Sequence, residues 1–297
     1  MKNQRKNNEA GFYWLFSAPA LSIYALVIIV PTFYSLFLSF FEWSGTGIPK
    51  FIGLQNYVAM LDSVEFRHSL YNNMMIVVIS IFLQIPLGFI LAWILYRRLV
   101  AAPGLFQSLI FFPVVISPVV IAILFKTVFT TGGLLEAIIA GLKDDPLYML
   151  SSFQGKYTAI IPVLLVIMWM YAGLYMIIFL ANLQKISPEV IEAAIVDGAG
   201  ELQIMKNIAL PSLMPIFVTS SIYAIAGSLK SFDLVYVMTG GGPSYYTEVL
   251  ASHMYKSTFT YNFYGYGAAV TVVIVLLSVG LISLLNFVAD KFSAKYE

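Results

Sequence analysis

Six long apolar runs dominate this sequence of 297 residues. Each contains at least the roughly 20 apolar residues that cross a bilayer as an α-helix. They occupy residues 12–41, 70–96, 105–129, 157–183, 212–237 and 264–288. Backbone amides cannot stay unpaired in lipid, and none of these runs alternates as the strands of a closed barrel do. We therefore predict an all-α membrane protein with six transmembrane helices, in a single transmembrane domain over residues 1–297.

The composition agrees with a chain that lies in lipid. Hydrophobic residues make up 60% of the sequence and charged residues 10%, whereas soluble domains average about 45–50% and about 25%. The net charge of +1 gives no reason to expect a nucleic-acid partner. With no cysteine and only two histidines, His68 and His253, the chain offers no set of metal ligands. We expect both histidines in solvated loops or at the membrane edge, and no bound metal.

The first run is too long for a cleaved signal peptide. Apolar sequence continues to Phe41, well past the roughly 7–15 residues of a signal core, so we expect an uncleaved first helix. Lys and Arg in the connections then set the orientation, because cytoplasmic loops carry more of them. Nine such residues fall on one side and five on the other. We predict that both termini and the loop over about residues 184–211 are cytoplasmic.

That loop contains the signals of a short helix. Ser187-Pro188 is a favourable start, because Ser caps and Pro fits the first turn, and Gly198 is a favourable end. The pattern predicts a helix over 188–197. Three residues would share one of its faces by their spacing: Ile191, Ala194 and Ile195. Either this helix packs on its own bundle, or its small residues let it dock closely into a groove of a partner.

The residues from Glu192 to Pro211 carry a more specific pattern. They spell EAAIVDGAGELQIMKNIALP, which resembles the EAA loop of the permease subunits of bacterial ATP-driven (ABC) importers. Fixed spacing over about 20 positions makes chance agreement rare. Further segments resemble the carbohydrate and glycerol-phosphate branch of that family, which includes the maltose permeases: residues 51–57, 96–98, 111–113, 117–120, 179–188, 239–243 and 266–269.

This resemblance implies a division of labour between subunits. The loop helix would be a coupling helix, which seats in a cleft of the ATPase subunit. The residues implied in that contact are Glu192, Ala193, Ala194, Asp197, Gly198 and Met205, the last standing where the family usually has Phe. The implied partners are a second permease subunit, two ATP-binding subunits, an extracellular solute-binding protein and the lipid of the bacterial inner membrane. ATP and Mg would be held by the ATP-binding subunits, and this chain would bind no cofactor.

No feature of the sequence indicates an enzyme. Residues 240–243 are Gly-Gly-Gly-Pro, but a phosphate-binding loop needs Lys and Ser or Thr after its glycines. We find no clustered His, Asp, Glu or nucleophile that would form a catalytic site. The alternative function is an ion-coupled secondary transporter, which would need a carboxylate near the middle of the membrane. Asp233 and Glu136 lie near the ends of apolar runs, so we predict ATP-driven import of a sugar or oligosaccharide.

The fourth and fifth runs carry side chains suited to a sugar. An aromatic ring can cover the apolar face of a pyranose, and hydroxyls can bond its OH groups. We predict a solute path lined by Trp169, Tyr171, Tyr175, Tyr223, Ser228 and Ser231. The alternative for each of them is helix–helix packing. Lys230 and Asp233 also stay open: they pair with each other, reach the membrane interface, or touch solute.

Overall fold

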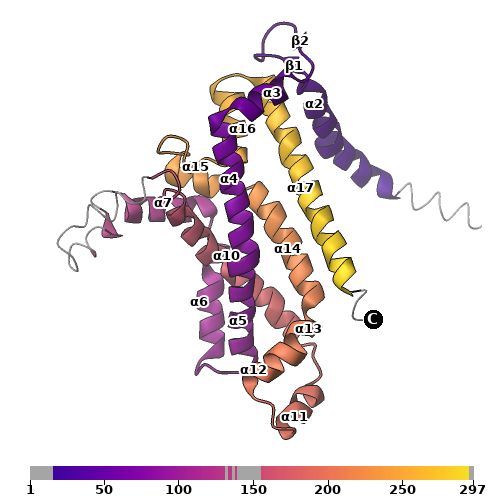
Figure 1. The fold of residues 1–297 in the computed structure, drawn as a ribbon, viewed down its shortest axis with the longest axis vertical. Helices are drawn as coiled ribbons and strands as arrows, with labels where there is room; N and C mark the ends of the chain where they lie inside the picture. Colours follow the sequence, from indigo (N-terminus) through magenta and orange to yellow (C-terminus); the bar gives the residue numbers. More distant parts are fainter. Residues whose placement is uncertain (1–15, 131–132, 136–137, 139–154, 294–297) are drawn as a thin grey trace, which may run out of the picture. The chain divides into compact units, whose positions relative to one another are not determined.

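The computed structural model describes residues 16–130, 133–135, 138 and 155–293. These residues form helices apart from one two-stranded hairpin, which confirms the all-α prediction (Figure 1). The chain divides into two compact units. The first contains Met1–Asp62 and Met254–Val273, and the second contains Ser63–His253 and Ile274–Glu297.

The first unit begins with the N-terminal helix Phe16–Leu38. Its later elements are the antiparallel strands β1 (Phe41–Glu42) and β2 (Lys50–Phe51), then α3 (Gln55–Asp62), the turn η5 (Lys256–Thr260) and the start of α17 (Tyr264–Ser293). Polar contacts join these segments across the sequence. The amide of Asn56 donates to the carbonyl of Ser39 at 2.8 Å, and the N–H of Tyr264 donates to the carbonyl of Trp43 at 3.0 Å.

The second unit holds the long packed helices. In chain order they are α4 (Val64–Ile79), η2 (Ser80–Gln84), α5 (Ile85–Tyr96), α6 (Pro103–Val115), α7 (Pro118–Phe129), α10 (Ile161–Leu183), α11 (Pro188–Val196), α12 (Glu201–Ile204), η4 (Met205–Ala209), α13 (Leu210–Ser212), α14 (Met214–Leu229), α15 (Asp233–Thr239) and α16 (Leu250–Tyr255), which runs on into the first unit. The helix α10 is central, and it packs against α5 and α6. The backbone carbonyl of Ile110 on α6 lies so close to Gly173 that a Cβ there would meet it at 2.3 Å. A glycine is therefore needed for these two helices to touch.

Two of the predicted helices are broken. The run 105–129 folds as α6 and α7, which meet at 96°. The break lies at Ser117, whose extended backbone is what the following proline favours. The prediction of one helix over 212–237 is wrong, because α14 ends at Leu229 and α15 begins at Asp233. Among the described residues, four helices are long and apolar enough to cross a membrane. Two bent pairs, α6 with α7 and residues 201–212 with α14, raise the number to six if each pair counts as one span.

Three prolines each follow a widened turn of π-helix. The turns are Ala25–Ile29, Ser80–Gln84 and Met205–Ala209, and the prolines are Pro31, Pro86 and Pro211. Directly before each proline, a backbone N–H bonds the carbonyl five residues earlier, as Ile85 does with Ser80. Proline lacks an N–H and crowds the carbonyl four residues before it. The wider turn therefore relieves that crowding while the helix continues.

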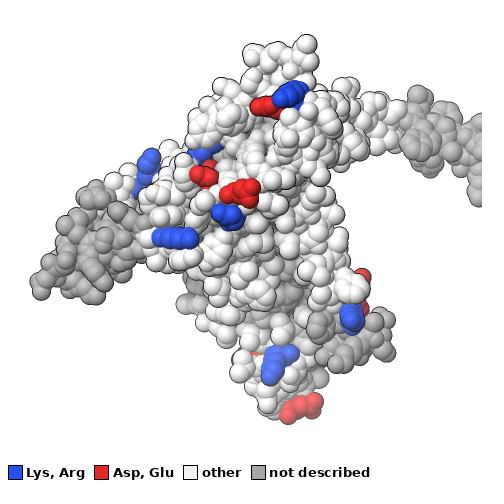
Figure 2. Space-filling model, turned by 45° about the horizontal axis from the view of Figure 1, so that its top comes forward, with Lys and Arg blue, Asp and Glu red and all other residues white. Residues whose placement is uncertain are grey.

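The surface is mostly apolar, as expected of a chain in lipid. Phe82, Leu276 and Phe287 are all more than half exposed. Figure 2 shows a face on which charged side chains are few and scattered. An ordinary soluble protein exposes large apolar side chains at single, scattered positions. This chain exposes far more of them. This surface fits lipid and partner subunits in a membrane.

Candidate functional site: the loop helix and its connections

The predicted loop helix is present as α11, Pro188–Val196, one residue shorter than expected. Gly198 ends it as predicted. With φ of +83°, its N–H donates to the carbonyl of Ile195 at 3.0 Å and the N–H of Ala199 to that of Ala194 at 2.9 Å, which is a Schellman motif. The prediction that Ser187 caps the helix is wrong. Its hydroxyl donates to the carboxylate of Glu189 and accepts no backbone N–H.

One side of α11 lies in the protein's own core, and the other side is open. Ile191 is 3% exposed, and Ala194 is half-buried beside it. Ile195 was predicted to share that face, but it is half exposed. The open side carries most of the residues predicted to contact an ATPase: Glu192, Ala193, Asp197 and Gly198.

Two apolar residues of the loop that we did not predict are also exposed, one on α11 and one on α12. Val196 is 86% exposed and Leu202 is 70% exposed. Met205, which is also predicted to contact the ATPase, is half-buried against the core. The loop therefore presents small, acidic and apolar side chains outward, and larger apolar side chains inward. A short helix anchored on one side and open on the other can receive a partner surface.

The inner face of the loop joins a core that reaches into α5 and α10. Ile191 and Ile204 lie in one buried cluster with Phe89, Trp93 and Leu183. Phe89 and Phe179 meet edge to face at 5.5 Å between ring centroids. Burial of a large apolar side chain stabilises the packing by about 1.5–3 kcal/mol. The loop helix is thus fixed to the lower ends of two long helices, which Figure 1 shows beside α11 and α12.

An ion pair adds a directional link that the sequence did not predict. Arg97, just after α5, binds Glu201 at the start of α12 through two nitrogens: Nε to Oε2 at 2.9 Å and Nη2 to Oε1 at 2.6 Å. This bond to the carboxylate raises the pKa of Arg97 above its usual value. The guanidinium also lies 6.0 Å from the ring of Trp93. The pair places Arg97 and the loop on the same side of the membrane.

The residues predicted to line a solute path do not form one cluster. Tyr175 is buried in the core cluster and Tyr171 is half-buried, both on α10. Trp169 packs its ring against Phe125, with 5.5 Å between centroids. On α14, Tyr223 is 64% exposed and Ser228 is buried. Ser231 follows α14 and is half-buried.

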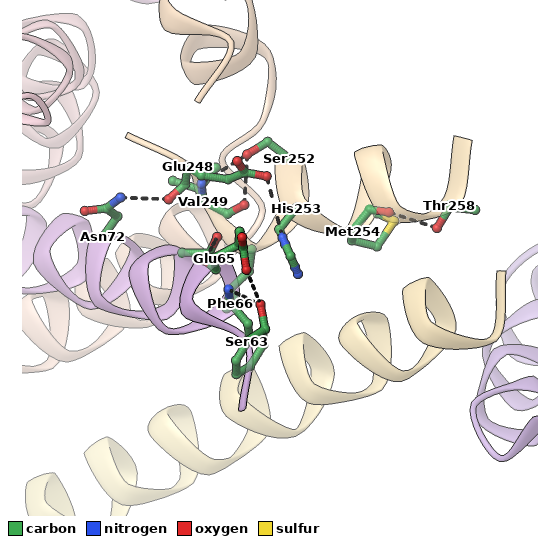
Figure 3. A network of polar contacts seen from close by, with 12 residues as sticks. Ser63, Glu65, Phe66, Asn72, Glu248, Val249, Ser252, His253, Met254 and Thr258 are labelled. Atoms are coloured by element: carbon green, nitrogen blue, oxygen red, sulfur yellow. Dashed lines mark hydrogen bonds and ion pairs between the residues drawn. The ribbon is translucent and has the colours of Figure 1, made fainter. Parts of the chain in front are cut away.

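A buried polar network lies around the middle of α4, and sequence reasoning missed it (Figure 3). The amide of Asn72 donates to the carbonyls of Tyr246 and Glu248, at 2.9 and 2.8 Å. The amide of Asn73 donates to the carbonyl of Ser228 at 2.7 Å, and its oxygen accepts from the N–H of Leu250 at 2.7 Å. Two adjacent asparagines therefore hold the turn before α16 and the last turn of α14 together.

His253 belongs to the same network, so its predicted place in a solvated loop is wrong, and its predicted place at the membrane edge stays a prediction. It is mostly buried and lies 3.6 Å from the carboxylate of Glu248, which is 1% exposed. Figure 3 shows the two side chains turned toward each other. The signal available in the sequence was the pair of asparagines inside the apolar run 70–96. Polar residues in such a run usually bond to neighbouring helices.

Comparison with known proteins agrees with the resemblance. Residues 84–295 match the family model described as "Binding-protein-dependent transport system inner membrane component". The probable ABC transporter permease protein YurN of Bacillus subtilis is 35% identical over 90% of this chain and 92% of its own. The multiple sugar-binding transport system permease protein MsmF of Streptococcus mutans is 30% identical over 96% of both chains. The lactose transport system permease protein LacF of Rhizobium radiobacter is 32% identical over 94% of this chain and 93% of its own.

Solved structures show the same fold. A chain of a bacterial ABC transporter involved in the import of the acidic polysaccharide alginate superposes with a TM-score of 0.83 at 18% identity, over 98% of this chain and 99% of its own. A second, a bacterial alginate ABC transporter in complex with an alginate pentasaccharide-bound periplasmic protein, gives 0.80 at 20% identity, over 96% and 97%. Together with the family match, these findings show that the chain belongs to the inner membrane components of binding-protein-dependent transport systems.

Proposed function

We propose that this chain is the permease subunit of an ATP-driven importer that carries a sugar or oligosaccharide into the cell. The observation that carries the proposal is α11, whose inner face is anchored by Ile191 in the core and whose outer face is open. The named substrates of its relatives support the sugar class, since one is a multiple sugar-binding system and another a lactose system. Family membership favours ATP-driven import over an ion-coupled secondary transporter.

Other subunits would supply the energy and the solute. We infer two ATP-binding subunits that hold ATP and Mg, a second permease and an extracellular solute-binding protein. A related transporter has been solved with a periplasmic protein bound, which supports the last of these. This chain would bind no cofactor. The exposed residues Glu192, Ala193, Asp197 and Gly198 would contact the ATP-binding subunit, with Val196 and Leu202 beside them.

The mechanism would be alternating access. When ATP closes the partner subunits, the outer face of α11 moves, and its inner face passes that displacement to α5 and α10 through the core around Ile191 and Trp93. Packed interiors transmit such shifts because they are dense and resist compression. The central cavity would then open outward to receive solute.

The orientation and the solute path follow from the same proposal. Both termini and the loop over residues 184–211 would face the cytoplasm of a bacterium, with the chain crossing the inner membrane several times. The solute would pass between α10 and α14, where Trp169, Tyr171, Tyr175, Tyr223, Ser228 and Ser231 are the candidates. Among these, the exposed Trp169 and Tyr223 are the better candidates, because a residue that lines a path must be reachable.

Transport in sealed vesicles tests the proposal. The chain would be purified with the subunits encoded beside it and reconstituted in proteoliposomes. The proteoliposomes would contain Mg-ATP and carry no ion gradient. We expect uptake of radiolabelled lactose or maltotriose that requires both ATP and the binding protein. Uptake driven by a sodium or proton gradient without ATP would refute ATP-driven import. Hydrolysis of ATP without uptake of either sugar would exclude these two sugars and leave ATP-driven import standing.

A further inference from the structure

One continuous helix joins two polar contacts that lie far apart. The helix Val64–Tyr96 runs through α4, η2 and α5. The asparagine pair Asn72 and Asn73 lies near one end, and Arg97 follows the other end. At about 1.5 Å of rise per residue, the 24 residues from Asn73 to Arg97 span about 36 Å. A single rigid element therefore reaches from the loop helix to the buried network of Figure 3.

At the Arg97 end, the loop touches this helix only through non-covalent contacts. The loop is joined in sequence to α10 and, through η4 and α13, to α14. A displacement of α11 and α12 can reach α5 through the apolar contacts of Ile191 and Ile204 and through the ion pair of Arg97 with Glu201. Apolar contacts allow sliding, whereas a two-point bond between guanidinium and carboxylate fixes direction as well as distance. The ion pair is therefore the contact that best fixes the register between loop and helix.

At the other end, the helix holds the segments that follow α14. Asn73 bonds the carbonyl of Ser228 in the last turn of α14 and the N–H of Leu250 at the start of α16. Asn72 bonds the turn between α15 and α16. The two side chains donate three of these hydrogen bonds and accept the fourth, and each of them is at most 1% exposed. Any shift of the helix along its axis must therefore move these segments or break buried bonds.

We propose that Arg97 and Glu201 are positioning residues that make the helix Val64–Tyr96 move with the loop helix α11, so that a partner's displacement of the loop reaches the segments held by Asn72 and Asn73. This rests on the proposed function, because it needs an ATP-binding subunit on the outer face of α11. Neither residue would touch solute or nucleotide. Their role would be to pass motion to the far end of the helix.

The test measures motion at the far end when nucleotide is bound. This chain has no cysteine, so Tyr71→Cys, at an exposed site beside Asn72, gives it a single reactive thiol. The complex with its partner subunits would be compared without nucleotide and after trapping with Mg-ATP and vanadate. The rate of labelling with a maleimide would be followed on this chain alone. We expect trapping to change that rate by about fivefold or more, the lower range of typical coupling.

Variants at the ion pair decide the matter. In Arg97→Ala, the change on trapping should fall to less than about twofold, while the amount of co-purified ATP-binding subunit stays the same. The exchange Arg97→Glu with Glu201→Arg should restore the change, which a purely structural loss would not allow. Arg98→Ala is the matched control, because Arg98 is exposed and next in sequence, and it should behave like the parent.

The outcomes separate this proposal from the proposed function. If trapping changes labelling equally in the parent and in Arg97→Ala, the positioning role is wrong. If trapping changes nothing at residue 71 in the parent, the helix does not carry the motion and the proposal is wrong as well. If the purified complex contains no ATP-binding subunit, the proposed function itself is refuted.

Discussion

Two replacements of Gly198 can distinguish the effect of backbone strain in the loop helix from the effect of added bulk on its surface. Gly198 has φ of +83°. An L-residue in this conformation costs about 1–2 kcal/mol, which lowers the population of the native last turn of the helix about 5- to 30-fold. A Cβ at this position would have no heavy atom within 4 Å. Gly198→Ala and Gly198→Trp therefore carry the same backbone strain, but only Trp adds bulk, and that bulk points into open space.

We expect the two variants to differ sharply. In Gly198→Ala the helix is still anchored by the buried Ile191, so uptake and co-purification of the ATP-binding subunit should fall only partly. In Gly198→Trp both should be lost, while membrane insertion stays normal, because the indole would occupy the space that the partner needs. The assays are ATP-driven uptake of labelled sugar in proteoliposomes and quantitative co-purification.

Gly200→Ala is the control for a small change nearby, since Gly200 has φ of −75° and its Cβ would meet only a side-chain oxygen at 3.9 Å. It should leave uptake and assembly unchanged. Full uptake with normal co-purification in Gly198→Trp would refute the idea that this face of the loop meets a partner. Equal losses in the Ala and Trp variants would show that backbone strain, and not the surface, is what matters.

Three further predictions follow from the packing and the orientation. Asn73→Ala removes a donor and an acceptor that are both buried, and it should lower the free energy of unfolding by about 2–4 kcal/mol. Thermal unfolding in detergent checks this, and Asn73→Asp should not restore stability, because it keeps the acceptor but sets a buried carboxylate against the carbonyl of Ser228. Gly173→Ala forces a Cβ to 2.3 Å from a backbone oxygen, so the yield of folded protein should fall. Gly104→Ala, whose Cβ would have nothing within 4 Å, is the control and should leave the yield unchanged. Equal yields of the two variants would contradict the close approach of α6 and α10. In intact cells an impermeant thiol reagent should label Tyr261→Cys but not Gly200→Cys, and the reverse result would overturn the orientation.

The sequence was sufficient where a local signal decides the structure. Gly198 ends the loop helix in αL because no side chain obstructs that conformation. Apolar runs of sufficient length predicted the long helices, since lipid leaves the backbone no other partner. The run 105–129 was predicted as one helix. A proline favours a kink, but the 96° bend goes with the packing of α7 on α15, which no local pattern contains.

Contacts between residues that are far apart in the sequence could not be predicted from it. Arg97 and Glu201 are 104 positions apart, and each alone is an ordinary charged residue at the edge of an apolar run. His253 was expected near solvent because lone histidines in loops usually are, yet the turn before α16 folds back onto α4 and buries it. Glu136, which the sequence places near the end of an apolar run, lies outside the described residues. Pairings of this kind are decided by tertiary packing, which overrides residue type.

The π turn at Ser80–Gln84 explains how one helix keeps the same side inward over its whole length. Before the turn, the buried residues include Asn73, Ile76 and Val77; after it, they include Gly88, Phe89 and Ala92. In an uninterrupted α-helix, at about 100° per residue, the centre of the second set would lie about 110° around the axis from the first. The π turn inserts one extra residue and so cancels most of that rotation. Removal of one residue between Ser80 and Gln84 would turn the buried stripe of α5 toward lipid, although every side chain in it would be unchanged.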